Sequence, residues 1–305
     1  MRKLSFLLLL AVFTCLVNAQ NRELKVSTFN IRNDNQGDAD NGNGWQNRYP
    51  VIAGMILFND MDIVGTQECK NNQVIDLKNA MAKYNYSYIG RGRGANPTDD
   101  EYSAIFYKTN RFSLISSGNF WLSQTPDVPS KGWDAALNRI CTWGKFKEKT
   151  TGFVFFVFNL HMDHIGVEAR KNSSILVLKK MKELAQNLPV CLTGDFNVDQ
   201  YSEGYKILTT SGMLSDSYLV SPIVYDPNGT FNSFEISNTT NQRIDHVFVS
   251  KQFKPARYGV LTELYWSDKS GRPSHPRDFP AETTVVEGTP RLPSDHYPVM
   301  VALKY

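Results

Sequence analysis

Acidic and amide side chains follow apolar runs at two places in this sequence, each time just after a glycine. Residues 188–198 read L-P-V-C-L-T-G-D-F-N-V, so that Asp195 and Asn197 come directly after the run, and residues 61–68 (M-D-I-V-G-T-Q-E) end on Glu68 in the same way. Such runs are typical of buried strands. Because ligands bind at the carboxyl ends of strands in layered α/β domains, both places are candidates for chemistry.

Further polar residues stand beside β-branched or aromatic runs: Asn30, His161, Asp245 and the adjacent Asp295 and His296. Polar motifs that recur in one local setting predict a single shared site. Carboxylates such as Glu68 and Asp295 are hard oxygen ligands that suit magnesium, manganese or calcium. No cysteine–histidine spacing resembles a zinc site. The histidines therefore need not be ligands and can pair with carboxylates instead.

This set of groups suits the hydrolysis of a phosphate ester. Asp195 could orient or deprotonate the attacking water, while Asn197 holds that carboxylate and a phosphoryl oxygen. His296, supported by Asp245, would donate a hydrogen bond to the phosphoryl group. A metal ion on Glu68 would polarise a non-bridging oxygen or the leaving oxygen.

Each of these residues also has a purely structural interpretation. Asp295 could be a cap or turn residue and Asn197 a turn residue, and Arg139, which precedes a strand, could be a solvated edge residue. His164 and His275 lie in predicted loops, where a histidine without a role is the simpler interpretation. The hypothesis of one site rests on the joint pattern and not on any single residue.

The elements that position these groups alternate between strands and helices. The pattern predicts a strand at 23–31, a long exposed loop at 32–49, a helix at 50–58 begun by its proline, and a strand leading to Glu68. The remaining predicted elements are helices at 73–83, 168–188 and 201–213, strands at 86–89, 101–107, 112–122, 141–147, 152–160, 243–249 and 297–303, and an insertion at 267–293. Long insertions of this kind are usually functional or mobile.

The two halves of the sequence echo each other. S-T-F-N-I, I-V-G-T-Q-E and A-I-F-Y in the first half match V-F-N-L-H, L-T-G-D-F-N and D-H-V-F-V in the second. This repetition predicts two similar β-sheets packed face to face, with helices outside and the polar strand ends gathered at one edge. The spacing favours an antiparallel or mixed sandwich over a parallel sheet.

Residues 1–19 are interpreted as a signal peptide, with Arg2 and Lys3 before an apolar run and a small-residue cleavage site ending at Ala19. A membrane anchor or a lipid-anchored Cys15 is the alternative. The mature chain, 20–305, is predicted to be a single catalytic domain, secreted or periplasmic, without a stable membrane span and monomeric. Its three cysteines are an odd number, so at least one thiol is unpaired, and Cys69 and Cys191 are expected to be buried free thiols. Loss of Arg2 and Lys3 lowers the net charge from +3 to about +1, which argues against a dedicated nucleic-acid binder.

Seven motifs together resemble the endonuclease/exonuclease/phosphatase (DNase I-like) superfamily. In chain order they are N-I-R (30–32), G-T-Q-E (65–68), E-Y-S-A-I-F-Y (101–107), N-L-H-M-D-H (159–164), G-D-F-N (194–197), R-I-D-H-V-F-V (243–249) and L-P-S-D-H-Y-P-V (292–299). The resemblance implies an α/β (α+β) fold, namely a four-layer sandwich of two mixed β-sheets with helices outside. It also implies a magnesium-dependent (or manganese-dependent) phosphoesterase.

The resemblance assigns expected roles to individual residues. Glu68 is the principal metal ligand with Asn30 and Asp295 nearby, and Asp245 and His296 form a paired dyad. The other catalytic candidates are Asp195, Asn197, His161 and its expected carboxylate partner Glu101. Arg139, His164 and Asn30 are the candidates for substrate binding, and Arg139 lies in N-R-I-C-T-W, typical of an exported bacterial subgroup.

Three functions fit this pattern. The leading one is an exported phosphatase or phosphodiesterase acting on a small or glycan-linked phosphate, because Trp45, Trp133 and Tyr102 mix with polar residues in the predicted loops. A secreted nuclease is second, although no clustered run of basic residues is present. A sphingomyelinase-like enzyme is third, and only Phe120 and Trp121 hint at the exposed aromatic hairpin it would need. A binding module that has lost catalysis is the alternative of a different class.

Overall fold

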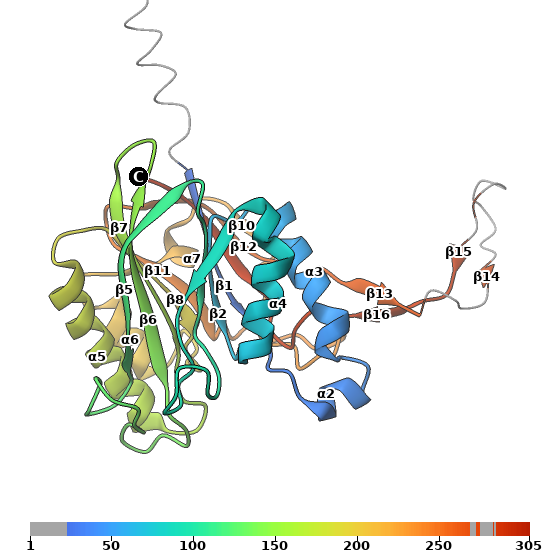
Figure 1. Ribbon diagram of the computed structural model, residues 1–305, viewed down its shortest axis with the longest axis horizontal. Coiled ribbons are helices and arrows are strands. Elements are labelled where there is room, and N and C mark those ends of the chain that lie inside the picture. The colour runs from blue at the N-terminus through green and yellow to red at the C-terminus, as the bar shows by residue number, and fades with distance from the viewer. Residues whose placement is uncertain (1–22, 269–272, 275–282, 284) are drawn as a thin grey trace, which may run out of the picture.

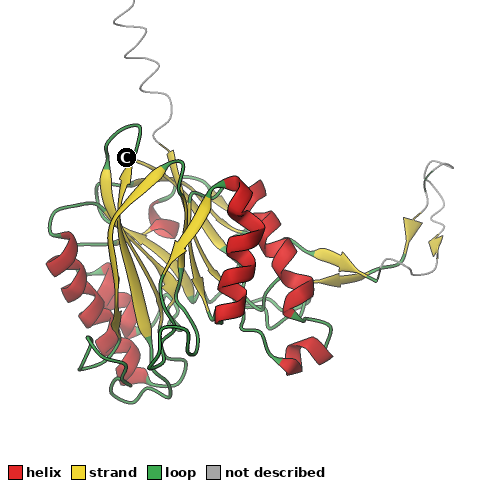
Figure 2. Cartoon of the chain, in the orientation of Figure 1, coloured by secondary structure: helices red, strands yellow, loops and turns green. Residues whose placement is uncertain are grey.

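Two β-sheets pack face to face at the centre of the molecule, and helices cover their outer faces (Figures 1 and 2). The structure is a computed structural model that describes residues 23–268, 273–274, 283 and 285–305. The expected signal peptide and His275 lie outside the described residues. The predicted fold class is confirmed, because both sheets are mixed and the longer helices cover their outer faces.

The first sheet has seven strands. In spatial order they are β10 (Val224–Tyr225), β12 (Lys254–Val260), β17 (Val299–Lys304), β1 (Glu23–Asn30), β2 (Ile63–Gln67), β4 (Ile105–Lys108) and β3 (Tyr86–Ile89). The second sheet has six strands, in the order β5 (Phe112–Trp121), β6 (Ile140–Glu148), β7 (Val154–His161), β8 (Val190–Asp195), β11 (Asp245–Val249) and β9 (Ser215–Asp216).

The hydrophobic core has three layers because each sheet is apolar on both faces. Side chains such as Val26 and Val157 fill the space between the sheets. On the first sheet, α3 (Trp45–Phe58) and α4 (Asn71–Met81) bury residues such as Ile52 against the outer face. On the second sheet, α5 (Val167–Ala185) and α6 (Glu203–Thr209) do the same with residues such as Val177. Short helices α2 (Gln36–Asp40), α7 (Ser217–Val220) and η1 (Ala82–Tyr84) complete the connections.

The predicted internal repeat is present in the strand pairing. In the first half, β1 pairs with β2 in parallel and β2 pairs with β4 in antiparallel orientation. In the second half, β7 pairs with β8 in parallel and β8 pairs with β11 in antiparallel orientation. The register places Asn30 beside Gln67 and His161 beside Asp195, so both parallel pairs end in polar residues.

Some predicted boundaries were wrong. Helix α3 begins at Trp45 and contains Pro50, because the burial of Trp45 and Arg48 offsets the backbone hydrogen bond that proline cannot donate. The strand expected at 101–107 begins only at Ile105. In α5 the expected inward residue Ile175 is 49 % exposed, since the helix packs through smaller side chains such as Ala169.

The insertion is a pair of two-stranded ribbons that project from the body (Figure 1). Strand β13 (Tyr265–Ser267) pairs with β16 (Thr289–Arg291), and β14 (Pro273–Ser274) pairs with β15 (Val285–Val286). We call the described part of this insertion the arm. Its first ribbon joins the body close to Asp295, so the insertion predicted from the sequence begins and ends beside the candidate site.

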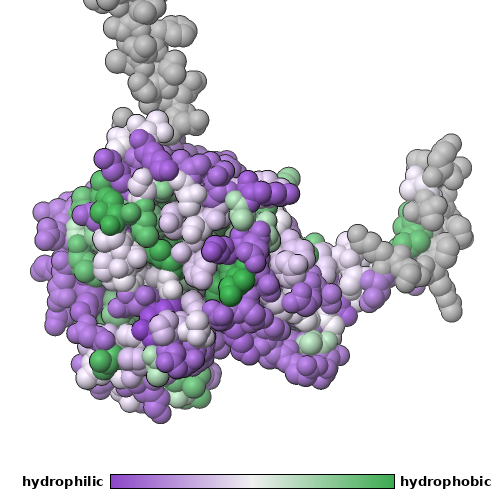
Figure 3. Space-filling model, in the orientation of Figure 1, coloured by the Kyte–Doolittle hydropathy of each residue, from purple (hydrophilic) through white to green (hydrophobic). Residues whose placement is uncertain are grey.

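The three cysteines of the described chain are buried and unpaired. This was predicted for Cys69 and Cys191, and Cys141 is the same. None of the described helices is long and apolar enough to cross a membrane. On the face shown in Figure 3, hydrophobic residues form small separate patches among hydrophilic ones.

Candidate active site

The strand ends of both sheets meet at one edge of the sandwich. Parallel strands β1, β2, β7 and β8 all end there, and the antiparallel strands β11 and β17 begin there, so their first residues reach the same edge. This placement brings together Asn30, Glu68, His161, Asp195, Asn197, Asp245, Asp295 and His296. The prediction of polar strand ends gathered at one edge is confirmed.

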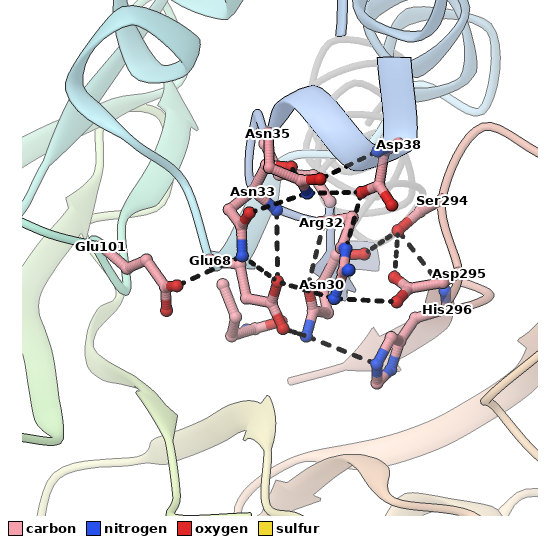
Figure 4. Close-up of polar contacts among 12 residues, drawn as sticks. Asn30, Arg32, Asn33, Asn35, Asp38, Glu68, Glu101, Ser294, Asp295 and His296 are labelled. Atoms are coloured by element: carbon pink, nitrogen blue, oxygen red, sulfur yellow. Dashed lines mark hydrogen bonds and ion pairs between the residues drawn. The ribbon is translucent and has the colours of Figure 1, made fainter. Parts of the chain in front are cut away.

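Asn30 connects the two sheets at the centre of this edge. Its amide nitrogen donates to Glu68 Oε1 at 3.0 Å (Figure 4). The same nitrogen donates to Asp195 Oδ2 at 2.9 Å. Its amide oxygen accepts from the backbone N–H of Arg32 at 3.0 Å. The amide nitrogen, and not the oxygen, therefore faces the carboxylates, so the expected role as a metal ligand requires the amide to turn.

Glu68 is held in a fixed position just beyond β2. Its backbone lies in the left-handed region at φ 63°, and Asn33 donates to Oε2 from its backbone N–H (3.2 Å) and its side chain (3.1 Å). Burial acts to raise the pKa of the carboxyl, but the hydrogen bond from Asn30 and the charges of His296 and Arg32 bring it below its usual value. Glu68 is therefore kept ionised, as a metal ligand must be.

The internal repeat also explains the position of Asn197. It follows Gly194 by three residues, as Glu68 follows Gly65, and it too is left-handed, at φ 49°. Its backbone N–H donates to Asp195 Oδ1 at 2.9 Å, and its side-chain nitrogen lies 3.0 Å from Met162 O and 3.2 Å from His161 Nε2. Asn197 thus holds Asp195 as expected, but through its main chain.

Asp195 is buried near a second carboxylate, that of Asp245. It is 1 % exposed, and burial together with the nearby charge of Asp245 raises its pKa to about 7. His161 Nε2 lies 3.5 Å from Oδ2, but burial and the positive charges of Arg139 and Arg93 hold the pKa of His161 well below its usual value. A neutral His161 therefore faces a carboxyl group that changes its charge near neutral pH.

His296 and Asp245 form the expected dyad. His296 Nδ1 lies 2.9 Å from Asp245 Oδ2, and both side chains are buried. Burial favours the neutral ring, but Asp245, Asp195 and Asp295 together raise the pKa of His296 well above its usual value. The ring is therefore an imidazolium whose Nε2, 3.9 Å from Asp195 Oδ2, points into the site.

Glu101 has a different partner from the one predicted. Its Oε2 lies 3.0 Å from Arg93 Nη1, and Asn33 donates to Oε1 at 3.3 Å. The described residues show no contact between Glu101 and His161, so the expected pairing of these two side chains is wrong. Burial raises the pKa of Glu101 to about 7, against the charge of Arg93. Arg93 was missed because it lies in a glycine-rich loop without a motif.

Arg139 lies inside the site wall and not on a solvated strand edge. Its Nε donates to Asp163 Oδ2 at 3.3 Å and its Nη2 lies 2.9 Å from His164 Nδ1, while Nη1 is buried with no hydrogen-bond partner among the described residues. Burial and the charge of Arg93 lower the pKa of Arg139. A buried guanidinium with a free N–H is ready to bind an anionic group.

Arg32 lies between the acids on the other side of Glu68. Its Nη1 is 3.5 Å from Asp295 Oδ2 and 4.0 Å from Glu68 Oε2, and its Nε donates to Asp38 at 2.8 Å (Figure 4). Burial and the charge of Glu68 raise the pKa of Asp295. The N-I-R motif contained this arginine, but only the fold shows that it contacts acids from three separate segments.

Arg48 holds the segments that carry the site residues in place. The sequence indicated only that it lies one helical turn from Trp45. It is fully buried, stacks between Trp45 and Phe234, and donates to the carbonyls of Asn43, Ile31 and Pro293 at 2.6–3.1 Å. It therefore joins the segment after Asn30 to the segment before Asp295.

The aromatic residues expected in the substrate loops are mostly structural. Trp45 and Tyr102 are 1 % and 4 % exposed, so neither lines a pocket, while Trp133 is half-buried. Phe120 and Trp121 are also buried, so they cannot form an exposed membrane hairpin. Trp45 and Tyr102 were assigned to loops from the sequence because the residues that bury them lie in distant segments.

Known proteins that resemble this chain include members of one family of phosphoesterases. The family model described as "Endonuclease/Exonuclease/phosphatase family" matches residues 27–296. A protein of that family from Bacteroides thetaiotaomicron is 50% identical, with a TM-score of 0.85 over 93% of this chain and 98% of its own. A mannosyl-6-phosphatase from the same organism is 50% identical, with a TM-score of 0.85 over 92% of this chain and 100% of its own. A relative from Bacteroides vulgatus is 34% identical, with a TM-score of 0.78 over 93% and 99%.

Proposed function

The chain belongs to the endonuclease/exonuclease/phosphatase family, and we propose that it is an exported phosphatase that removes phosphate from a sugar or glycan. Its family and relatives make it a hydrolase of phosphate esters that works with a divalent metal ion. The substrate and the export are the proposed parts.

The main support for the proposed substrate is the likeness of this chain to a mannosyl-6-phosphatase, over the whole length of that protein. The likeness amounts to 50% identity over 92% of this chain, so it extends over most of the fold. A phosphorylated hexose, free or at the end of a glycan, is therefore the favoured substrate. The low net charge supports this choice over a polyanion, whose binding rests on several Lys or Arg contacts.

The residues at the edge of the sandwich fit a hard divalent ion. Glu68, His161 and Asp195 each offer a ligand atom within 4.8 Å of the others. Glu68 is ionised, with Asp295 and the amide of Asn30 nearby, which favours magnesium or manganese. When bound, the ion would supply Lewis-acid polarisation of a phosphoryl or leaving oxygen.

The other groups can bind the phosphate and handle the proton of the attacking water. Asp195, with a pKa of about 7, can accept that proton at neutral pH. The His296 imidazolium can donate from Nε2 to a phosphoryl oxygen, because Asp245 holds its Nδ1 proton. Arg139 Nη1, which is buried without a hydrogen-bond partner among the described residues, is a second donor near His161.

Export is proposed from residues 1–19 alone. Arg2, Lys3, the apolar run that follows and the small residues before Gln20 have the order of a signal peptide. Outside the cytoplasm, the enzyme would meet glycans and not signalling phosphoinositides. N-terminal sequencing of the protein recovered outside the cytoplasm tests this step, and a mature chain that still begins at Met1 would overturn it.

The decisive assay measures phosphate release from mannose 6-phosphate with purified protein and Mg²⁺. Plasmid nicking and sphingomyelin cleavage are measured at the same enzyme and metal concentrations, with the Glu68→Gln variant as the control for contaminating phosphatases. We expect efficient release that stops in chelator and in the variant. Efficient nicking with hexose phosphates left intact would favour the nuclease instead.

A further inference from the structure

A polar cavity opens beside the acids of the candidate site. It has a volume of about 560 Å³ and shares Arg32 and Asp295 with that site. Its other walls come from three segments: the turn after α2, the loop around Phe231–Glu235, and Arg291 on the arm. None of these three segments contains a residue that the candidate chemistry uses.

The loop 231–235 is tied directly to the catalytic segment. The backbone N–H groups of Asn232 and Ser233 donate to Asp295 O at 2.8 and 3.1 Å. The Phe231 ring lies edge-on to His296, with 5.0 Å between centroids, and it is 42 % exposed. Phe231 therefore covers the imidazole with one side and presents its other side to solvent at the cavity.

The arm closes the opposite wall through Arg291. Its Nη1 donates to Asn41 O at 3.0 Å and to Asn43 Oδ1 at 3.1 Å. Gly42 lies against the same guanidinium, and a Cβ there would approach Nη2 to 2.3 Å. The arm thus docks on the turn after α2 through Arg291, and the insertion becomes part of the cavity wall.

The chemistry of this lining suits a neutral polyhydroxyl molecule. Two cations, Arg32 and Arg291, face three carboxylates, Asp38, Glu235 and Asp295, so the cavity offers no attraction to a polyanion. The asparagines and Ser233 add both donors and acceptors, and the exposed Phe231 ring adds an apolar face. Aromatic faces with convergent polar groups fit the two faces of a sugar ring.

The size of the cavity indicates more than one sugar. A hexose has a dozen heavy atoms and fills on the order of 200 Å³ at the packing density of organic solids. The cavity is more than twice as large. A free hexose phosphate would leave most of the lining in contact with water alone.

We propose that this cavity binds the leaving-group part of the substrate and that this part is a neutral oligosaccharide of at least two hexose units. The inference rests on the proposed function, since it names the substrate class of the same site. The phosphorylated sugar lies next to Asp295, with Phe231 against its ring. The following sugar reaches Glu235 and Arg291.

The test compares three substrates: mannose 6-phosphate, an α-mannobiose phosphorylated at the 6-position of its non-reducing sugar, and p-nitrophenyl phosphate. We expect the wild type to use the phosphorylated disaccharide about tenfold better, by kcat/KM, than mannose 6-phosphate, which corresponds to about 1.4 kcal/mol. Neutral mannobiose should inhibit the hydrolysis of p-nitrophenyl phosphate competitively.

Substitutions in the cavity should lower activity on the phosphorylated disaccharide selectively. Phe231→Leu keeps bulk against His296 but removes the aromatic face, and Glu235→Ala removes an exposed acceptor. Each should lower kcat/KM for the phosphorylated disaccharide at least fivefold more than for p-nitrophenyl phosphate. Phe58→Ala, at a residue that is 91 % exposed at the end of α3, and Glu183→Ala on α5 are the matched controls and should change neither rate.

The outcomes separate this inference from the proposed function. If the wild type cleaves mannose 6-phosphate but gains nothing from the second sugar, and the variants affect all substrates equally, the cavity inference alone is overturned. If the wild type cleaves p-nitrophenyl phosphate but no sugar phosphate, the proposed function fails first. Melting curves that match the wild type exclude misfolding as the cause of any loss.

Discussion

Buried charge is arranged in opposite ways at the two ends of the β-sandwich. At the end where β2 begins, Asp62 lies 2.6 Å from Arg111 and 3.0 Å from Lys108, and Arg111 also lies 2.7 Å from Glu148. Each acid there has a cation, and hydrogen bonds from Thr151, Tyr305 and Arg111 lower the pKa of Glu148 against the effect of burial. We call this group the paired end.

At the other end, carboxylates crowd together with fewer direct cationic partners. Asp195, Asp245, Asp295, Glu68 and Glu101 lie near one another, and burial with mutual repulsion raises the pKa of Asp195 and of Glu101 to about 7. A fold selected for stability alone would pair such buried charges. The crowded end is therefore arranged to receive a ligand, and substitutions at the two ends should have opposite effects on activity and stability.

The largest expected effect is that of Asp195→Asn. Turnover of the phosphate ester should fall about 10³- to 10⁴-fold, because the variant loses the group that accepts the proton of the water. Without metal, the raised pKa of Asp195 means that its ionisation lowers the free energy of unfolding. This loss develops as the pH rises from about 4 to about 7. The variant should therefore melt higher than the wild type at pH 8, and activity within tenfold of wild type would contradict the assignment.

Metal removal should have a similar effect on turnover. Dialysis against chelator is expected to lower the rate at least about 10²-fold, because Glu68 and the neighbouring acids lose the ion that they would hold. Added Mg²⁺ or Mn²⁺ should restore the rate and raise the melting temperature, because the ion offsets the repulsion at the crowded end. Full activity in chelator would disprove metal dependence.

The dyad should behave as a unit. His296→Ala and Asp245→Asn are each expected to lower kcat about 10²- to 10³-fold, and the double variant should be hardly worse than the more severe single one. The reason is that Asp245 acts through the imidazole that it orients at 2.9 Å. Independent, multiplying losses in single-turnover measurements would show that the two residues act separately.

Asp62→Asn tests the paired end. It should destabilise the protein by about 2–3 kcal/mol, because Asp62 is 2 % exposed and its removal leaves Arg111 and Lys108 without their main acid. Specific activity at 25 °C should stay within twofold of wild type, since the site lies at the other end of the strands. Urea unfolding and the phosphatase assay together check this. Lost activity with unchanged stability would contradict a structural role for the paired end.

Glu148→Gln is expected to have the smallest effect, and its sign depends on pH. The pKa of Glu148 is lowered in the folded protein, so the carboxylate stabilises the fold above its ordinary pKa of 4.5 and loses this contribution as the pH falls through the folded value. The variant should melt a few degrees lower than the wild type at pH 6, and the difference should shrink toward pH 3. A gap that widens in acid would contradict the expected sign.

The sequence by itself determined the local part of this site. Glu68 and Asn197 each stand three residues after a glycine that ends an apolar run, and this short-range pattern is enough to place a polar residue at a strand end. The two-sheet sandwich followed from the repetition of this pattern in both halves. The pairing of His296 with Asp245 followed from the resemblance and is present at 2.9 Å.

Only the tertiary structure decided which side chains meet across the sheets. Glu101 pairs with Arg93 and not with His161, and Arg32 contacts Asp295 from a segment more than 260 positions away in the chain. Such contacts depend on how the two sheets and their loops pack against each other. The residue pattern within one strand does not determine that packing. The same reason explains why Trp45 is part of the core. It also explains why Phe231 and Arg291 line a cavity that no sequence motif predicted.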